Sequence, residues 1–262
     1  MDWLYGSIEA TIAAYLWPMA RIGGMMMVMT TIGSNTTPMR VRLLLVFAMT
    51  IAVAPVLPAM PAVPLFSFEA YWILAQQLLI GIAAGFVSLL LLQTFVLAGQ
   101  IIGMQTSLGF ASMVDPTNGQ QVPLVGQFYL ILTTLLFFLF DGHLTMIRML
   151  VASFETLPVG ETSLNVANLR ALAEWGGWMF GAALTVAISA IVALLLINFS
   201  FGVMTRAAPQ LNIFAIGFPI TMISGLIILW LTLGGIMSHF ENTWNAAQGL
   251  LCQLLELPCR IP

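Results

Sequence analysis

Residues 70–103, AYWILAQQLLIGIAAGFVSLLLLQTFVLAGQIIG, contain no charged side chain. A helix of this length rises about 50 Å, whereas the hydrocarbon core of a bilayer is ~30 Å thick. Backbone polar groups find no water inside that core, so a run of this kind satisfies them as a helix. We therefore expect 70–103 to be helical and to bend, tilt or double back.

The rest of the chain has the same character. Hydrophobic residues make up 60% of the 262 residues and charged residues only 6%, whereas about a quarter of a soluble domain is charged. Five further apolar runs are each long enough to cross a membrane, at 10–33, 43–66, 124–150, 175–204 and 211–238. Prolines and glycines interrupt several of them. The sequence predicts an all-α membrane protein with about six long, kinked hydrophobic helical segments.

The few charges indicate an orientation. Arg40 and Arg42 occupy the first connection and Arg206 the last, whereas acids gather at the alternate segment ends. The positive-inside rule then places both termini outside the cytoplasm. The basic residues are arginines without any lysine, which argues against a nucleic-acid-binding arm, so we expect no nucleic-acid partner.

Ionisable residues inside apolar segments are costly and have a functional or structural reason. Arg21, His143 and Arg148 are the candidates. For Arg21 we favour a structural pair, with Glu9 or with an acid of another subunit, over a transport role. The Asp141-Gly142-His143 triplet is more typical of a helix interruption than of a proton relay.

The glycine spacing and a methionine-rich stretch predict close helix packing. Gly81-x-x-x-Gly85 and Gly99-x-x-x-Gly103 are weak signals of close helix approach. The methionine-rich stretch GGMMMVM, 23–29, favours gap filling in a crowded interface over a seal around a conduit.

Two features bear on chemistry. Cys252 and Cys259 are separated by six residues without a histidine cluster, so incidental thiols are favoured over a disulfide. No nucleophile with a paired base, metal motif or phosphate loop occurs, so we expect neither an enzyme nor a cofactor.

The segment 104–123, MQTSLGFASMVDPTNGQQVP, interrupts the apolar pattern. Its first half is small and apolar, and its second half contains the turn formers Asp-Pro and Asn-Gly. Non-helical backbone at membrane depth is tolerated only when it is buried in protein or lines a cavity. An ordinary surface loop and a re-entrant loop plugging a pore both remain open on these grounds.

Four stretches, in this order and spacing, resemble the FliR family of flagellar export-gate proteins and its injectisome counterparts. They are TTPMRVRLLL (36–45), AGQIIGMQTSLGFASMVDP (98–116), FDGHLTMIRMLVASFETLPVG (140–160) and RAAPQLNIFAIGFPITMISGL (206–226). The resemblance covers nearly the whole chain.

This resemblance implies a structural, pore-forming subunit that assembles with FliP and FliQ into a gated conduit for unfolded flagellar subunits across the bacterial inner membrane. It implies a FliP-like part over 1–174 and a FliQ-like helical hairpin with the C-terminal tail over 175–262. Other implied partners are FlhB, FlhA and basal-body rod components, and the gate is expected at the basal body, raised toward the periplasmic side.

The resemblance also implies that a loop over about 106–123 plugs the pore. The expected plug residues are Leu108, Gly109, Phe110, Ala111, Ser112, Met113, Val114, Asp115, Pro116, Asn118 and Gly119. The residues expected to contact partners or to hold the structure are Arg21, Arg40, Arg42, His143, Arg148, Arg206, Pro209, Gln210 and Asn212.

Two other functions remain as alternatives. A secondary transporter with broken helices would have an internal repeat and intramembrane acids, neither of which stands out. An intramembrane enzyme using Asp115 or Asp141 with His143 would lack a second carboxylate at a matching depth.

Overall fold

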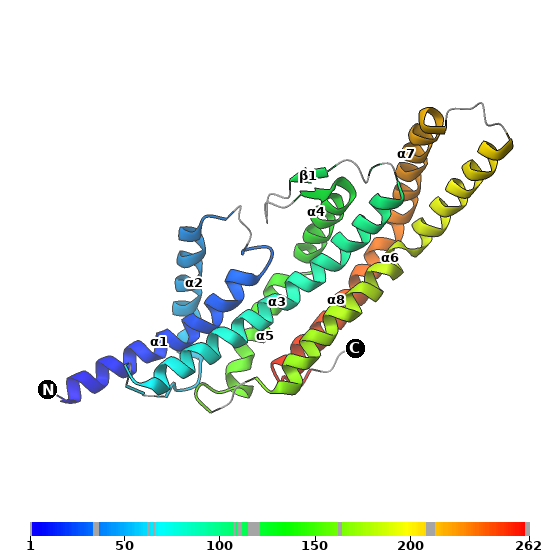
Figure 1. Ribbon diagram of the computed structural model, residues 1–262. Helices are drawn as coiled ribbons and strands as arrows, with labels where there is room; N and C mark the ends of the chain where they lie inside the picture. The colour runs from blue at the N-terminus through cyan, green and yellow to red at the C-terminus, as the bar shows by residue number, and fades with distance from the viewer. Residues whose placement is uncertain are drawn as a thin grey trace. The chain divides into compact units, whose positions relative to one another are not determined.

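The computed structural model describes residues 2–33, 37–61, 63–64, 66–106, 108, 112–114, 121–161, 164–207 and 213–259. Helices dominate this part of the chain (Figure 1). They are α1 (Asp2–Val28), α2 (Met39–Val53), α3 (Phe68–Gln105), α4 (Leu124–Leu139), α5 (Gly142–Thr156), α6 (Val166–Ala207), α7 (Ile213–Thr232) and α8 (Ile236–Leu254), with the short 3₁₀ helices η1 (Ala54–Val56) and η3 (Leu233–Gly235). The predicted all-α membrane class is confirmed.

Within the described residues, four helical stretches are long and apolar enough to cross a membrane: 39–56, 68–105, 166–204 and 217–254. The bent pair α4 and α5 is a fifth if it counts as one span. α1 is not among them, since Arg21 and Pro18 lower the hydropathy of the 10–33 run. That run was expected to be long enough to span; in its helix Trp17 and Arg21 are buried, whereas Ile12, Tyr15 and Met19 are exposed.

The structure shows the course of three predicted segments. The run 70–103 does not double back, because α3 continues unbroken from Phe68 to Gln105. The run 43–66 leaves helical geometry after Val56, within a stretch where proline recurs. The run 124–150 bends by 60° between α4 and α5. Asp141 adopts a left-handed backbone conformation there, φ 51°, which confirms the predicted interruption.

One compact unit consists of residues 1–90, 138–175 and 245–262. Its core includes Trp17 of α1, Ile73 of α3 and Phe154 of α5. α1 and α3 approach closely, since a Cβ added to Gly24 would lie 2.8 Å from the carbonyl oxygen of Leu78.

The predicted glycine packing is present in this unit. A Cβ added to Gly85 of α3 would lie 2.6 Å from the carbonyl oxygen of Met25, so only glycine allows this approach. Met25, Met26 and Met29 are fully buried. These three methionines therefore fill a crowded helix interface, as the gap-filling interpretation of the 23–29 stretch predicted.

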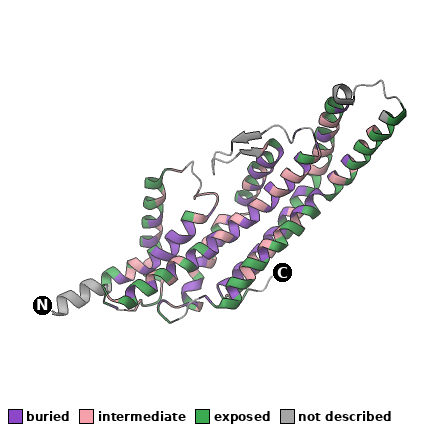
Figure 2. Cartoon of the chain, viewed as in Figure 1, coloured by how far each residue is buried: buried purple, intermediate pink, exposed green. Residues whose placement is uncertain are grey.

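The second compact unit consists of residues 91–137 and 176–244. In it α3 packs on α8, with the rings of Phe95 and Phe240 5.8 Å apart, and α4 packs on α8 through Phe137 and Trp244 at 5.4 Å. α6 lies beside α8, since both line one pocket. Exposed residues follow much of α6 and α7 (Figure 2).

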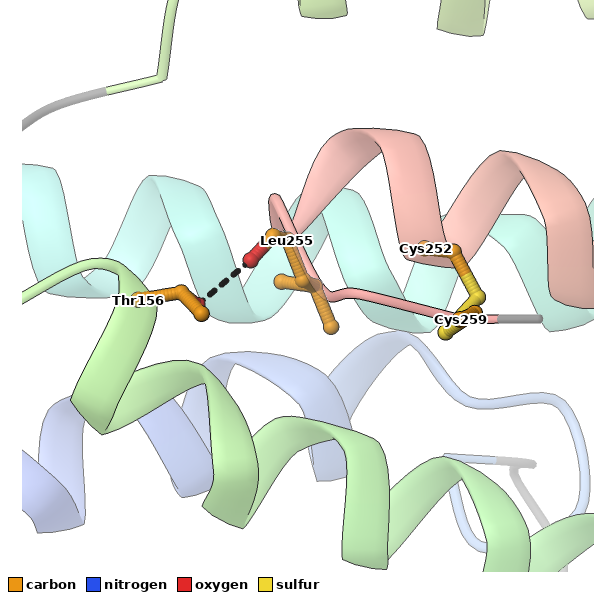
Figure 3. The surroundings of a disulfide bond; sticks show 4 residues. All are labelled: Thr156, Cys252, Leu255 and Cys259. Carbon is orange, nitrogen blue, oxygen red and sulfur yellow. Dashed lines mark hydrogen bonds between the residues drawn. A yellow bond between two sulfur atoms is a disulfide. The ribbon is translucent and has the colours of Figure 1, made fainter.

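The two cysteines are bonded to each other (Figure 3). Glu256 takes a left-handed conformation, φ 53°, and the N–H of Leu257 donates to the carbonyl oxygen of Cys252, so the chain turns back beside α8. This turn brings the Cα atoms of Cys252 and Cys259 to 5.8 Å. The expectation of incidental thiols is therefore wrong. Beside the disulfide, the Thr156 hydroxyl donates to Leu255 O at 2.6 Å.

Candidate functional site

The candidate site is the segment between α3 and α4, together with the helix ends that hold it. Two short strands lie in it, β1 (Ser112–Val114) and β2 (Gln121–Pro123). They pair antiparallel, with Met113 opposite Val122. The sequence reasoning missed these strands, although a turn-rich stretch between two short apolar pieces is a hairpin signal.

Four of the expected plug residues lie in the described part of the chain. Leu108 is buried, and Ser112, Met113 and Val114 form β1. The other expected plug residues lie outside the described residues: Gly109, Phe110, Ala111, Asp115, Pro116, Asn118 and Gly119.

The two helices that flank the loop touch backbone to backbone. A Cβ added to Gly99 of α3 would lie 2.8 Å from both Gly126 Cα and the carbonyl oxygen of Val125, at the start of α4. One turn later, a Cβ on Gly103 would make ordinary contact with Pro123 at 3.6 Å. The predicted packing role of Gly99-x-x-x-Gly103 is therefore confirmed, and it joins the two ends of the loop.

A third helix reaches the base of the loop. Thr106, the first residue after α3, is buried, and both its N–H and its hydroxyl donate to the carbonyl oxygen of Gly103, at 3.2 and 3.0 Å. Its methyl group lies against Gly225 of α7, where an added Cβ would come within 2.5 Å of Thr106 Cγ2. α3, α4 and α7 thus meet at one point, which we call the loop root: Gly99, Gly103, Thr106, Gly126 and Gly225.

Sequence reasoning missed three members of the loop root, namely Thr106, Gly126 and Gly225. Each is small, and no local pattern distinguishes it from the other glycines and threonines of the chain. Their shared property appears only when three helices distant in sequence come together.

Arg21 forms a separate buried site. Its Nε donates to Gln77 Oε1 at 2.8 Å, its Nη1 to the carbonyl and hydroxyl oxygens of Ser153 at 3.0 Å each, and its Nη2 to Leu157 O at 2.8 Å. The guanidinium also lies 4.0 Å from the ring centroid of Phe154. These hydrogen bonds join α1, α3 and α5.

The described hydrogen-bond partners of Arg21 are neutral groups. Ser153 O and Leu157 O belong to the C-terminal end of α5, where the helix dipole is negative, and Ser153 O also accepts the N–H of Leu157. A cation placed there is stabilised without an acid. The side chain of Glu9 lies outside the described residues.

The other expected polar residues do not form one cluster. Arg40, Arg148 and Arg206 are exposed on three different helices, while Arg42 donates to Thr37 O at 3.0 Å. The His143 ring contacts Phe138 at 5.0 Å, and its buried Nδ1 has no hydrogen-bond partner in the described structure. Pro209, Gln210 and Asn212 lie outside the described residues.

Among the residues that are described, no group of three or more His, Cys, Asp or Glu could hold a metal ion.

The geometry therefore defines a helical membrane protein whose distinctive feature is a loop held between apolar helices. A family model described as "Bacterial export proteins, family 1" matches residues 12–247. The chain is 38% identical over 245 residues to the flagellar biosynthetic protein FliR of Escherichia coli (strain K12), covering 93% of this chain and 94% of that protein.

Two further relatives carry the same name. The FliR of Pectobacterium carotovorum subsp. carotovorum is 38% identical and covers 93% of both chains, and that of Aquifex aeolicus (strain VF5) is 32% identical, covering 80% of this chain and 83% of its own. The chain therefore belongs to the FliR family of bacterial export proteins, as its motifs indicated. Membership makes it a component of flagellar protein export in the membrane.

Proposed function

We propose that this chain is a structural, pore-forming subunit of the flagellar type III export gate, assembling with FliP and FliQ homologues into a gated conduit for unfolded flagellar subunits. The conduit performs no catalysis, and its energy comes from the proton motive force and from partner proteins. The loop root carries the proposal. Three apolar helices converge on the ends of a short, turn-rich loop, which is the arrangement that a fixed base for a plug requires.

In this proposal the segment 106–123 closes the conduit at rest. Its apolar part, 108–114, is the stopper, and its turn-rich part, 115–121, lets the stopper move aside when substrate arrives. The close helix contacts at Gly99 and Gly225 support a fixed base, because a glycine interface of this kind has no free space in which to slide.

In the proposal, the chain has the two parts that the family resemblance implies. Residues 1–174 form the FliP-like part, and 175–262 form the FliQ-like hairpin and tail. α6 and α7 are the arms of that hairpin, and Arg206, exposed in the last turn of α6, lies at its cytoplasmic tip. This tip contacts FlhB, with FlhA and rod components as further neighbours.

The gate lies at the flagellar basal body in the inner membrane, raised toward the periplasmic side, with the C-terminal end of the chain facing the periplasm. The disulfide between Cys252 and Cys259 supports this orientation, because disulfides persist in oxidising compartments and are rare in the cytoplasm.

Deletion of residues 109–119 tests the plug. The deleted protein should still copurify with FliP- and FliQ-like partners, whereas cells that carry it should leak small ions, as measured by membrane conductance. A substitution outside the loop root, Gly177→Ala, serves as the control, because a Cβ there would meet no atom within 4 Å. Unchanged conductance in the deletion variant would refute the plug, and purification without such partners would refute the gate.

A further inference from the structure

A groove lies between α1 and α2, within the first compact unit. It has a volume of about 460 Å³ and is lined by Thr11, Ile12, Tyr15, Leu16 and Met19 of α1 and by Phe47 and Ile51 of α2. Its volume is within the ~300–1,000 Å³ of small-molecule sites, but its lining is almost entirely apolar. An occupant of this groove must therefore be mainly hydrocarbon.

The α2 wall of the groove continues along one face of the helix. Arg40, Leu44, Phe47 and Ile51 are spaced four, three and four residues apart, so they form a single stripe. Leu44, Phe47 and Ile51 are exposed, and Arg40 is exposed at the N-terminal end of the stripe. From Arg40 to Ile51 the helix rises about 16 Å, close to the ~15 Å depth of one hydrocarbon leaflet.

The charged end of this stripe attracts anions. No acidic residue occurs between Glu9 and Glu69, and the first turn of α2 contains none. Pro38 at the N-cap provides no side-chain hydrogen bond to the helix, so the positive end of the helix dipole is not offset there. The guanidinium of Arg42 donates hydrogen bonds to Thr37 O. Arg40 therefore presents its guanidinium next to a helix N-terminus that favours negative charge.

We propose that this groove binds an anionic phospholipid, with the phosphate at Arg40 and the α2 N-terminus and an acyl chain along Phe47 and Ile51. An anion site at one end of an exposed helix stripe about as long as a leaflet is deep, with an apolar groove at the other end, matches an amphiphile of that length. A packed protein helix would cover the trough without needing the charge. This inference does not depend on the export role, since it needs only a chain embedded in a membrane.

Native mass spectrometry of the full-length chain in detergent tests the lipid. Phosphatidylglycerol should be retained more strongly than phosphatidylcholine, and Arg40→Gln should lower phosphatidylglycerol retention about fivefold, the factor that ~1 kcal/mol per arginine represents. Arg170→Gln is the matched control, because Arg170 is an exposed arginine of α6 that is paired with Glu174, and it should leave the retention of both lipids unchanged. Equal retention of the two lipids, or unchanged retention in Arg40→Gln, overturns the proposal.

Two further measurements separate the lipid from a protein occupant. Ile51→Trp fills the groove and should reduce retention of both lipids. If this variant misfolds, the comparison of Arg40→Gln with Arg170→Gln still tests the proposal. A photocrosslinking amino acid in place of Phe47 should yield a phospholipid adduct in cells. An adduct to another polypeptide alone would overturn the lipid in favour of a partner subunit.

Discussion

At the residue scale, Arg21 shows how a charge can be kept in an apolar interior without an acid. Four oxygens, two of them backbone carbonyls at the end of α5, accept its N–H groups. The ring of Phe154 covers one face of the guanidinium and adds a cation–π contact. Arginine suits this place better than lysine, because its planar fork of donors reaches several fixed acceptors at once.

Replacing Arg21 with methionine should lower the free energy of unfolding by about 3 kcal/mol, since buried acceptors lose their donors at ~1–3 kcal/mol each. Thermal unfolding of the detergent-purified chain measures this loss. Arg148→Met is the matched control, because Arg148 is exposed on α5, and it should stay within ~0.5 kcal/mol of the unchanged chain. Equal midpoints for the two variants would show that the Arg21 network contributes nothing.

At the element scale, the ends of α3 and α4 determine the position of the loop. Their backbones touch at Gly99 and Gly126, so the distance between the helices is set by the absence of side chains there. α7 adds a second constraint through Gly225 and Thr106. A change at either contact therefore moves the base of the loop without touching the loop itself.

Gly99→Ala should lower the free energy of unfolding by about 1–3 kcal/mol, because the added methyl group overpacks the contact between α3 and α4. In the proposed gate it should also raise ion conductance, because the two helices are pushed apart at the loop root. Gly177→Ala makes the same chemical change on an exposed part of α6 with open space around it. That control should stabilise by up to ~1 kcal/mol through helix propensity alone. The prediction fails if both variants behave alike in unfolding and in conductance.

At the scale of the whole molecule, charge and redox chemistry point to the same orientation. The exposed arginines Arg40, in the first turn of α2, and Arg206, in the last turn of α6, lie at helix ends that the positive-inside rule assigns to the cytoplasm. Disulfides such as Cys252–Cys259 persist in oxidising compartments and are rare in the cytoplasm, and the positive-inside rule assigns this end of the chain to the outside. These two arguments are independent, because the first uses only charge and the second only the bonded cysteines.

Thiol labelling of spheroplasts tests the orientation. After treatment with a membrane-impermeant reductant, Cys252 and Cys259, the two cysteines of the chain, should react with an impermeant maleimide. In a variant with both cysteines replaced by serine and Arg206→Cys added, labelling should appear only after the membrane is permeabilised. Labelling of Cys252 and Cys259 only in permeabilised cells would place the C-terminal end in the cytoplasm and contradict the prediction.

Much of the architecture follows from local sequence. Long uncharged runs leave the backbone no alternative to helices in a membrane, so the 70–103 run predicts α3 closely. Glycines four residues apart predict close packing at Gly81, Gly85, Gly99 and Gly103, and the Asp-Gly-His triplet predicts the break before α5. The identity of the loop as the candidate site also comes from sequence, through its composition and its flanking motifs.

The sequence by itself therefore determined the helical class and the family, but it missed where several helices end, since α2 stops at Val53 and α8 extends to Leu254. Only the tertiary structure determined which helices meet. Arg21 and Ser153 are 132 residues apart, and the Arg21 hydrogen bonds depend on where α5 ends in space. Likewise, Gly225 matters only because Thr106 lies against it, and the cysteines bond only because Glu256 reverses the chain. The physical reason is that hydropathy and helix propensity act along the chain, whereas close packing and buried hydrogen bonds act between segments that no local pattern relates.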